Sequence, residues 1–515
     1  MGRIEGYALA LKGADLKQVF HSKEDGIPVK AQHSTTLNSE KHADRNLAKQ
    51  WNSINWKEVE DRVNRIQIRI AKATQNENWN LVKRLTYLLT HSYSAKLLAV
   101  RIVTQNRGKR SAGVDGQLWT TASDKMHAAI SLSDRHYRAN PLRRIYIPKP
   151  GKSTKRPLSI PTMRDRAMQA LYTLGLQPIA ETTADTRSFG FRLFKCTQDA
   201  SEYAFRCLCH KTSSPWILEG DIKGCFDNIS HSWLKNNILI DRSILSQFLK
   251  SGIIFENSFY PTDKGTPQGG NISPILANMT LNGLEMLLEK RFPRMKVHFI
   301  RYCDDFLVTT PSKEIAVEVR EIIRDFLSTR GLELSSEKTV ITHINEGFDF
   351  LGYNFRKYKG KLLIKPSKKS IKSITQKLKT IFSKAKSWTQ DKLIETLNPV
   401  ISGWANYHRH NVAKITFKKL DFHLWELTWQ WGIRRHPNKG LKWIANRYWT
   451  SDDSRNWVFQ TKEIKLQKFS NIHICRHSPP KLDANPFLDR NYFLKRKNHI
   501  KKQTPWIQTK LPFFF

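Results

Sequence analysis

Apolar residues recur every three or four positions from Trp56 onward, which predicts a helix with one buried face. Two more stretches with helical spacing follow, at Trp79–Thr90 and Ala95–Thr104. Residues 1 to about 50 are polar and show little periodicity. We therefore expect a flexible N-terminal extension followed by helices whose apolar faces pack into a core.

The pattern changes at Leu142, where residues alternate as in a strand up to Lys149. A Pro-Gly turn follows, and Arg156–Ile160 returns as a second strand, so we expect a hairpin rich in basic residues. Beyond it, strands and helices are mixed, which predicts an α+β fold. Strands are expected at 216–221, 297–302 and 306–310, and helices at 165–176, 199–211, 233–251, 274–291 and 313–329.

From Pro366 the chain becomes helical and basic, with further helices expected at Thr396–His410 and Phe417–Arg434. Three tryptophans of the last helix, Trp425, Trp429 and Trp431, are expected in the core of a helix bundle. A base-stacking platform is the alternative for these residues. From Leu441 to the end, the chain is rich in Lys, Arg and Trp.

Charge changes the picture more than any other property of the composition. The 515 residues carry 86 Lys and Arg against 45 Asp and Glu, a formal net charge of +41. From Leu351 onward there are 35 basic and 9 acidic residues, a net charge of +26, and this part also holds 9 of the 15 tryptophans. Such a field indicates nucleic acid as the partner, because cations neutralise phosphates and aromatic rings stack on bases.

Cysteines and apolar runs exclude several classes of protein. The six cysteines are scattered and contain no Cys-x-x-Cys pair, which argues against a zinc site or a disulfide framework and favours a reducing compartment. No apolar run approaches the length of a membrane span. We therefore expect a soluble protein without a membrane partner, associated with nucleic acid in a bacterial cytoplasm or in the matrix or stroma of an organelle.

Two adjacent acids, Asp304 and Asp305, separate two apolar strand-like runs. Carboxylates are costly inside a dry sheet, so we expect a tight hairpin turn with both side chains at its tip. Such a tip suits Mg²⁺, which prefers oxygen ligands and keeps substrate phosphates in its shell. The alternative is an ordinary exposed Asp-Asp turn.

A third acid, Asp221, ends the apolar run that begins at Trp216, and Phe226 follows five residues later. Two metal ions about 3.5–4 Å apart, held by carboxylates, clamp the attacking and leaving oxygens of a phosphoryl transfer. Three acids from two strands are enough to hold such a pair of ions.

These motifs, taken together and in this order, resemble those of reverse transcriptases, and more narrowly of the proteins encoded by group II introns. The resemblance covers roughly residues 50–490. The motifs that carry it are Tyr302-Cys303-Asp304-Asp305, Asp221 with Phe226, Pro267-Gln268-Gly269-Gly270-Asn271-Ile272-Ser273-Pro274, Gly113-Val114-Asp115-Gly116, Gly224-Cys225-Phe226-Asp227-Asn228-Ile229 and Gly403-Trp404-Ala405-Asn406-Tyr407-His408.

The resemblance implies a right-hand polymerase. Its fingers and palm contain an antiparallel sheet packed by helices, and an α-helical thumb or maturase domain and a basic DNA-binding segment follow. The expected divisions are a flexible extension at 1–50, helices and fingers at 51–215, a palm at 216–360, the thumb at 361–440 and the basic segment at 441–515. Fuller members of the family end in a zinc-stabilised His-Asn-His endonuclease, whose paired cysteines this sequence lacks, so we do not expect DNA cleavage.

The resemblance also implies roles for individual residues. Asp221, Asp304 and Asp305 would be catalytic and would hold two Mg²⁺ ions, with the backbone carbonyl of Ile222 as a further ligand. Nucleotide contacts are expected from Lys149, Arg156, Phe226, Gln268, Gly269 and Lys338. Phe226 would exclude a 2′-hydroxyl, and Lys338 would protonate the leaving pyrophosphate, although a solvated loop lysine is an equal alternative for Lys338. Cys303, where relatives commonly carry Ala, is small and apolar, and we expect activity to survive it.

The function that the resemblance implies is RNA-directed DNA polymerisation, together with binding of intron RNA that promotes splicing and retrohoming. The partners would be an intron RNA template, a DNA primer or target and dNTPs, and a dimer is possible. Two alternatives stay open. One is a maturase that acts mainly as an RNA-binding splicing cofactor, and the other is a domesticated reverse transcriptase of defence or repair.

Overall fold

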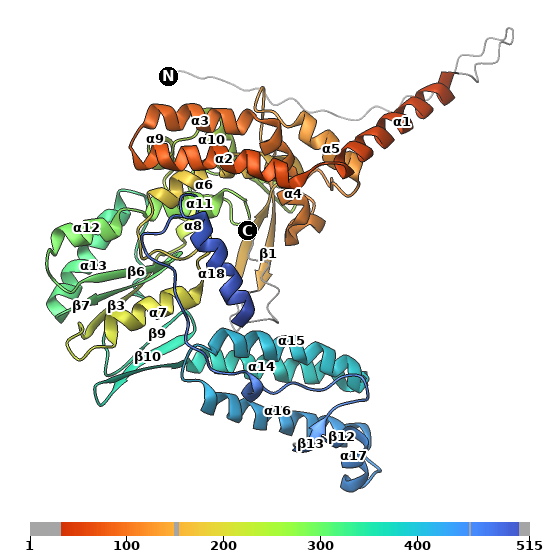
Figure 1. Ribbon diagram of the computed structural model, residues 1–515, viewed down its shortest axis with the longest axis vertical. Helices are drawn as coiled ribbons and strands as arrows, with labels where there is room; N and C mark the ends of the chain where they lie inside the picture. The colour runs from red at the N-terminus through yellow and green to blue at the C-terminus, as the bar shows by residue number, and fades with distance from the viewer. Residues whose placement is uncertain (1–31, 149–153, 453–454, 504–515) are drawn as a thin grey trace, which may run out of the picture.

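The computed structural model describes residues 32–148, 154–452 and 455–503 of the chain. Its N-terminal region is a layer of helices packed around α6 (Met163–Thr182), which is buried on nearly all sides (Figure 1). A helix buried on every face needs neighbours on every face, and α6 contacts α2, α3, α4 and α11. The other elements of this region are α1 (Gln32–Asn52), α2 (Trp56–Gln75), α3 (Trp79–His91), α4 (Tyr93–Gln105), η1 (Arg107–Arg110) and α5 (Ala122–Ser131).

The stretch before Trp56 differs from the prediction. Helix α1 covers residues 32–52, so the expected flexible extension is wrong for residues 32–50, and residues 1–31 lie outside the described part. Near the end of α1, the buried Trp51 packs edge-on against Trp56 with ring centroids 5.0 Å apart, and Leu47 packs against the same core. The rest of the helix is polar and therefore shows no apolar period.

Two sheets follow in the chain. The first has the order β2-β1-β4-β5, in which β1 and β2 form the predicted basic hairpin and β4 joins β1 in parallel. The second, called here the central sheet, has the order β6-β7-β3-β8 with antiparallel pairing throughout. The bounds are β1 (Leu142–Pro148), β2 (Lys155–Ile160), β3 (Trp216–Asp221), β4 (Ile253–Phe255), β5 (Ser258–Tyr260), β6 (His298–Tyr302), β7 (Asp305–Thr310) and β8 (Val340–His343).

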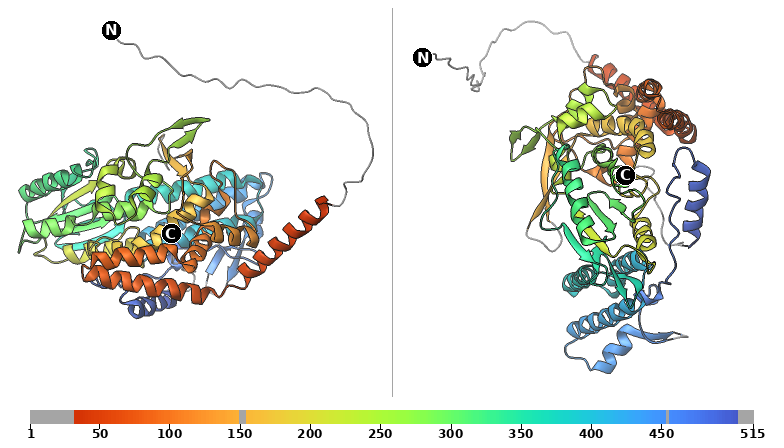
Figure 2. Two further views of the ribbon diagram at one scale, coloured as in Figure 1. Left: turned by 90° about the horizontal axis from the view of Figure 1, so that it is seen from above. Right: turned by 90° about the vertical axis from the view of Figure 1, so that its left-hand side faces the viewer.

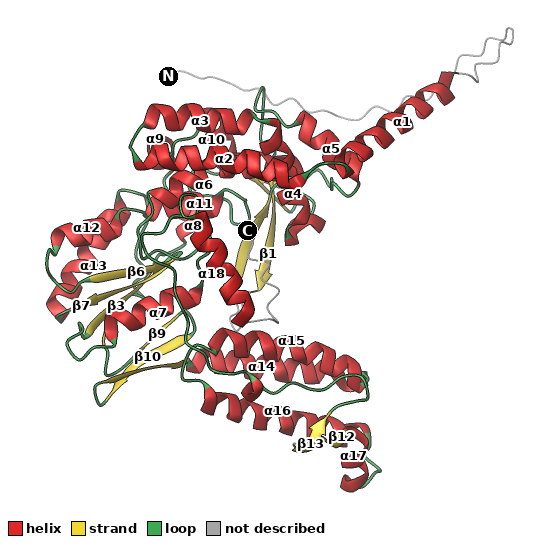
Figure 3. Cartoon of the chain, viewed as in Figure 1, coloured by secondary structure: helices red, strands yellow, loops and turns green. Residues whose placement is uncertain are grey.

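Helices pack on the central sheet, as the mixed pattern predicts (Figure 3). Two predicted helices are each divided in two. The stretch 233–251 is broken where Asp241 caps a new helix, and 274–291 is broken at Gly283, which has φ +94°. The helices are α7 (Thr197–Leu208), α8 (Cys225–Asn228), α9 (His231–Asn237), α10 (Arg242–Leu249), α11 (Ser273–Leu281), α12 (Leu284–Arg291) and α13 (Lys313–Ser328).

A third sheet, β9 (Phe348–Phe350), β10 (Tyr353–Tyr358) and β11 (Lys361–Pro366), leads into what we call the C-terminal helical domain. Its core runs from Ile374 to Phe469 without interruption. The predicted boundary between residues 440 and 441 cuts through this core and is therefore wrong. The elements are α14 (Lys368–Lys384), η2 (Ala385–Ser387), α15 (Gln390–His408), α16 (Lys414–Arg435), α17 (Leu441–Tyr448), β12 (Trp449–Asp452), β13 (Arg455–Phe459) and η3 (Phe469–Asn471).

The tryptophans of α16 do not share one environment. Trp431 is only 3% exposed and donates its indole N–H to the Ala385 carbonyl at 2.8 Å, as a core residue should. Trp425 is 39% exposed. The expectation of a buried set is therefore correct for Trp431 and wrong for Trp425.

Residues 472–503, called here the C-terminal strap, leave the helical domain and return along the body of the molecule (Figure 2). The Cys475 N–H donates to the Arg409 carbonyl at the beginning of the strap, and Asn485 donates to Thr182 at the end of α6. Helix α18 (Arg490–Gln503) ends the described chain. Within the described residues, none of the helices combines the length and the apolar content that crossing a membrane requires.

Candidate active site

Two of the three predicted acids end neighbouring strands of the central sheet. Asp221 is the last residue of β3 and Asp305 the first of β7, and the register pairs them directly. Side chains paired in this way lie on one face with Cβ atoms about 4.5–5.5 Å apart. Asp304 precedes Asp305 in the turn from β6 to β7. The structure therefore brings Asp221, Asp304 and Asp305 to one edge of the sheet.

The turn that carries Asp304 is tight. Tyr302 pairs with Asp305, so only Cys303 and Asp304 form the loop. Cys303 has φ +59°, as the first position of a type II′ hairpin turn requires. This conformation costs a residue with a Cβ about 1–2 kcal/mol. The contacts around the turn must therefore hold it in place.

The three carboxylates repel one another where access to water is reduced. Loss of solvent, and after it repulsion by Asp304 and Asp221, raises the pKa of Asp305 to about 7, although its side chain still lies at the mouth of the site. Burial also raises the pKa of Asp304, and Asp221 adds to this effect. Crowded carboxylates with raised pKa values are typical of sites that take a cation or a proton.

Lys338 supplies one positive charge at this edge. Its Nζ lies 2.6 Å from Oδ2 of Asp221, and this hydrogen bond raises the pKa of the lysine. The backbone N–H of Ser335 donates to the Asp221 carbonyl at 2.8 Å and fixes the loop before Lys338. The side chain of Lys338 is 56% exposed, so the amino group also reaches the open side of the site.

The backbone at Ile222 is oriented by a short antiparallel bridge to Leu334. Lys223 N–H donates to the Glu333 carbonyl, and Ser335 N–H donates to the Asp221 carbonyl, so the flanking residues make the hydrogen bonds. In such a pair the carbonyl of Ile222 itself points away from the Leu334 segment. It is therefore available beside Asp221.

The residues predicted to contact a nucleotide come from three segments. Arg156 is exposed on β2 and close enough to Asp304 to lower the pKa of that acid against the effect of burial. The side-chain amide of Gln268 donates to Asp227 at 3.0 Å. The backbone carbonyl of Gln268 accepts from the Ser159 N–H of β2 at 2.7 Å. Gly269 has φ +115°, and a Cβ there would lie 2.7 Å from the Ser159 carbonyl. Lys149 lies outside the described residues.

Phe226 lies in α8, directly after the turn that Gly224 makes with φ +54°. Its ring is half-buried and meets the ring of Phe191 edge-on, with centroids 6.1 Å apart. Its carbonyl accepts from Thr266 N–H at 2.6 Å. The ring thus contacts the loop that carries Phe191, and the backbone of Phe226 is fixed to the segment that leads to Gln268.

The support of the turn formed by Cys303 and Asp304 was not predicted from the sequence. Arg301, 1% exposed, donates to Asn278 and Asn282 at 3.1 Å and to the Cys303 carbonyl at 3.3 Å. Asn278 in turn donates to the carbonyl of Gly190 at 2.8 Å. The only signal in the sequence was an arginine inside an apolar strand-like run. The asparagines that bind Arg301 lie on α11 and directly after it, so the sequence alone does not bring them together.

Gly190 itself packs directly beneath the turn. A Cβ at this position would lie 2.9 Å from the Tyr302 carbonyl carbon and closer still to the backbone N and Sγ of Cys303. Only glycine fits this contact. The loop of residues 189–196 therefore forms the floor on which the turn of Cys303 and Asp304 lies.

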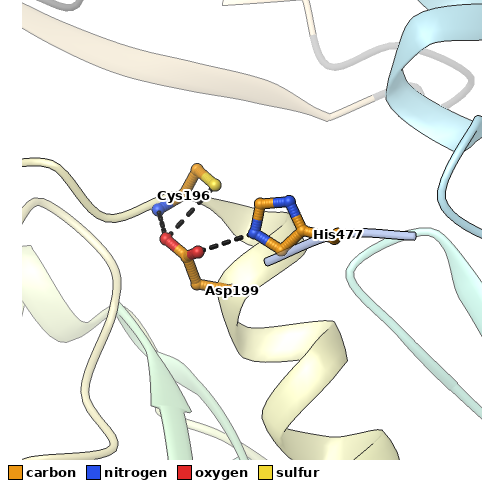
Figure 4. A group of neighbouring side chains, drawn as sticks. All are labelled: Cys196, Asp199 and His477. Carbon is orange, nitrogen blue, oxygen red and sulfur yellow. Dashed lines mark hydrogen bonds and ion pairs between the residues drawn. The ribbon is translucent and has the colours of Figure 1, made fainter. Parts of the chain in front are cut away.

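The other end of this loop is fixed by a buried carboxylate, Asp199 of α7 (Figure 4). Its Oδ2 accepts the backbone N–H and the thiol of Cys196, and its Oδ1 accepts from His477 at 2.7 Å and from Arg496 at 2.8 Å. The ligand atoms of Cys196, Asp199 and His477 lie within 4.8 Å of one another, as in a metal site. The cation at this carboxylate, however, is the guanidinium of the strap residue Arg496. We therefore interpret the cluster as an anchor of the C-terminal strap.

The donors at the edge of the central sheet fit hard divalent cations. Three carboxylates and one backbone carbonyl are all oxygen ligands of the kind that Mg²⁺ takes, and the carboxylates are close enough for Asp304 and Asp221 to add to the effect of burial on the pKa of Asp305. Such a set can bind a triphosphate through its metals and place a hydroxyl in line with a phosphorus atom. Reverse transcriptases as a family work with divalent metal ions.

Comparisons with known proteins point to one family along most of the chain. Residues 51–132 match the N-terminal domain of reverse transcriptase, residues 147–355 match reverse transcriptase (RNA-dependent DNA polymerase), and residues 371–449 match the group II intron maturase-specific domain.

Individual relatives agree. Protein YkfC of Escherichia coli is 31% identical over 53% of this chain and 82% of its own length. Group II intron-encoded protein LtrA of Lactococcus lactis is 29% identical over 68% of this chain and 69% of its own. Maturase-like protein 1 of Euglena gracilis is 24% identical over 67% of this chain and 75% of its own length.

Proposed function

The chain belongs to the family of group II intron-encoded reverse transcriptases with a maturase domain. From this premise we propose that it copies RNA into DNA at the acids of the central sheet. We also propose that it binds intron RNA to promote splicing and retrohoming. The observation that carries the polymerase part is the convergence of Asp221, Asp304 and Asp305 at one sheet edge. The partners are an RNA template, a DNA primer or target and dNTPs.

In the proposed reaction, the 3′-hydroxyl oxygen of the primer attacks the α-phosphorus of a dNTP. The new P–O bond forms as the bond to the pyrophosphate oxygen breaks. The proton of the hydroxyl passes to solvent, and pyrophosphate leaves. Asp221, Asp304, Asp305 and the Ile222 carbonyl would hold two Mg²⁺ ions, which would supply activation of the hydroxyl and neutralisation of the triphosphate.

The remaining residues bind and orient the nucleotide in this proposal. Arg156, together with Lys149, contacts the triphosphate from the β1–β2 hairpin. Gln268 and Gly269 contact the sugar and phosphates, and Lys338 donates the proton that the leaving pyrophosphate takes up. Because Lys338 already lies 2.6 Å from Asp221, it is within reach of a group bound at the acids.

Phe226 is proposed to close the space beside the 2′-carbon of the nucleotide. Phe226→Ala should then raise the incorporation of ribonucleotides relative to deoxyribonucleotides, because the ring no longer excludes the 2′-hydroxyl. The measurement is the ratio of kcat/KM for the two nucleotides on one primed RNA template. An unchanged ratio would remove Phe226 from this role.

The polymerase site is tested with Asp304→Asn in the full chain. Extension of a DNA primer on an RNA template should be lost, while affinity for the same duplex stays nearly unchanged. The matched control is Asp325→Asn, an acid of α13 whose side chain is 75% exposed and far from the metal ligands in the chain. Normal extension by Asp304→Asn would refute the proposed site.

The maturase part is supported by the match of residues 371–449 and by the basic charge of this region. These observations favour the intron-encoded interpretation over a reverse transcriptase of defence or repair. Splicing of an intron found around the reading frame should survive Asp304→Asn, because RNA binding does not need the catalytic acids. Loss of splicing in that variant, with normal RNA affinity, would contradict the separation of the two activities.

A further inference from the structure

The C-terminal helical domain has a cavity that the proposed reaction does not use. It lies between α16, the β12–β13 hairpin and residues 465–471, with a volume of about 230 Å³. In two views this end of the molecule lies opposite the N-terminal helices and away from the tips of β3 and β7 (Figures 1 and 2). We call it the aromatic pocket.

The floor of the aromatic pocket is buried, whereas its rim is exposed to solvent. The floor is buried core, to which Leu424, Trp449 and Phe459 contribute with 2–5% exposure. The rim consists of aromatic rings that remain in water: Phe422 is 62% exposed, and Trp457 is 50% exposed. Large apolar side chains gathered on a surface mark an interaction site, whereas single ones do not.

The rings of α16 form a row. Phe422, Trp425 and Trp429 are spaced i, i+3 and i+7, so they share one face of the helix. Trp425 is nearly parallel to Trp429, at 8° with centroids 6.1 Å apart, and Phe422 continues the row at 28° and 6.1 Å. Phe422 and Trp425, at the end of the row away from Trp429, are exposed to solvent. Every nucleobase can stack on an aromatic face.

Trp457 reaches the aromatic pocket through a strained backbone. Its φ is +65°, which is an outlier for a bulky residue, and the register between β12 and β13 shifts beside it. A bulge of this kind redirects a side chain, and here the ring lies 5.7 Å from Trp429 and 6.4 Å from Trp449. Strain of this sort is found where a ligand is clamped.

The charge at the aromatic pocket favours an anionic occupant. Lys465 and Lys468 line it, and Asp421 is the acid among its lining residues. The carboxylate of Asp421 already accepts the backbone N–H groups of Phe469 at 2.6 Å and Ser470 at 3.1 Å. Positive charge beside stacked rings suits a base with its flanking phosphate.

We propose that the aromatic pocket binds an unpaired base of a single-stranded RNA segment, with the adjoining phosphates at Lys465 and Lys468. A cavity of about 150 Å³ holds benzene, so 230 Å³ accommodates a nucleobase ring. RNA is the strand chosen because part of the pocket lies within the maturase-specific match, and the inference therefore rests on the proposed function. The base would belong to RNA outside the copied duplex, since the pocket lies away from the catalytic acids.

The test uses the full chain and a short single-stranded RNA that carries one 2-aminopurine, whose fluorescence falls when it stacks. Trp425→Ala and Trp457→Ala should each weaken binding by about 5- to 150-fold and abolish the fluorescence change, as expected for one stacked base. Trp457→Phe should restore most of both. Lys465→Gln and Lys468→Gln should each reduce the slope of log affinity against log salt by about 0.7.

A matched control is Trp443→Ala. Trp443 is 42% exposed in the same domain and does not line the pocket, so binding and fluorescence should not change. A fully paired RNA of the same sequence should show little dependence on Trp425 or Trp457. Asp304→Asn should keep the fluorescence change while it loses primer extension. Failure of the polymerase proposal is thereby distinguished from failure of the pocket proposal.

Several outcomes would overturn the inference. If the variants lost equal affinity for single-stranded and paired RNA, the tryptophans would have a structural role only. If the protein bound a single-stranded DNA of the same sequence with equal affinity, the choice of RNA would be overturned. Self-association that disappears with Trp425→Ala and Trp457→Ala in sedimentation would show that a second copy of the chain occupies the pocket. Unchanged RNA affinity in both variants would remove the site.

Discussion

A methyl group added at Gly190 should disable the active site without touching any predicted catalytic residue. The new Cβ would lie 2.9 Å from the Tyr302 carbonyl carbon and closer still to two atoms of Cys303. Ordinary contact begins at 3.4 Å, so the loop and the catalytic turn must separate by at least 0.5 Å (3.4 − 2.9). The opposing atoms include backbone, which cannot rotate away.

The effect on rate should be large compared with the effect on stability. Misplacement of reacting groups by about 1 Å can cost about 100-fold, whereas overpacking typically costs about 1–3 kcal/mol. We therefore expect Gly190→Ala to lower kcat for dNTP addition by about 10- to 100-fold, with a smaller change in KM. The protein should still unfold cooperatively.

The assay is single-turnover extension of a DNA primer on RNA, combined with thermal unfolding of the same preparations. Gly403→Ala is the matched control, because Gly403 lies within α15 and a Cβ there meets nothing within 4 Å. That variant should keep full activity and gain up to about 1 kcal/mol of stability. Wild-type kcat in Gly190→Ala would refute the idea that this contact positions the turn.

Three further predictions concern charge. In the metal-free protein, the raised pKa of Asp305 means that the native state binds a proton that the unfolded state has lost between pH 3.8 and about 7. Stability should therefore fall as pH rises through this window and level off above it. In EDTA, Asp305→Asn should reduce the dependence of the thermal unfolding midpoint on pH. Lys338→Gln should lower kcat by about 10²- to 10⁴-fold if the lysine is the proton donor. A change below about 5-fold would fit a half-exposed ion pair with Asp221 and no more. Asp199→Asn should lower the free energy of unfolding in urea by about 3–5 kcal/mol and expose the strap to protease, because it leaves the buried Arg496 without its anion. If the wild type bound stoichiometric zinc and the variant did not, the ion-pair interpretation would be contradicted.

The position of the acids could be predicted because the signal for each is local. Asp221, Asp304 and Asp305 each adjoin a short apolar run, and an acid in that setting marks the end of a strand. Their meeting at one edge depends on the strand order β6-β7-β3-β8, which the residue pattern does not give. The expectation that the three acids share a site came from the family resemblance. The roles of these acids remain predictions.

Other features could not be predicted because they depend on contacts between distant segments. Gly190 looks like any loop glycine until the Cys303 turn lies above it. The end of the thumb was misplaced at residue 440 because the Lys-, Arg- and Trp-rich chain from Leu441 resembles the family's DNA-binding segment, while the core continues to Phe469. The burial of Trp425 was misjudged because helical spacing does not tell whether a partner covers the ring.

One loop joins the catalytic turn to the far end of the chain, and this has a consequence for how the enzyme holds its geometry. At Gly190 the loop lies against the turn, and at Phe194 its ring stacks on Phe493 of the strap, with centroids 5.1 Å apart. Arg496 donates both to the Phe194 carbonyl and to Asp199. The strained φ of Cys303 therefore depends on a loop that the strap holds in place. The residues after the C-terminal helical domain thus fix the loop beneath the turn of Cys303 and Asp304, in addition to any contact that they make with nucleic acid.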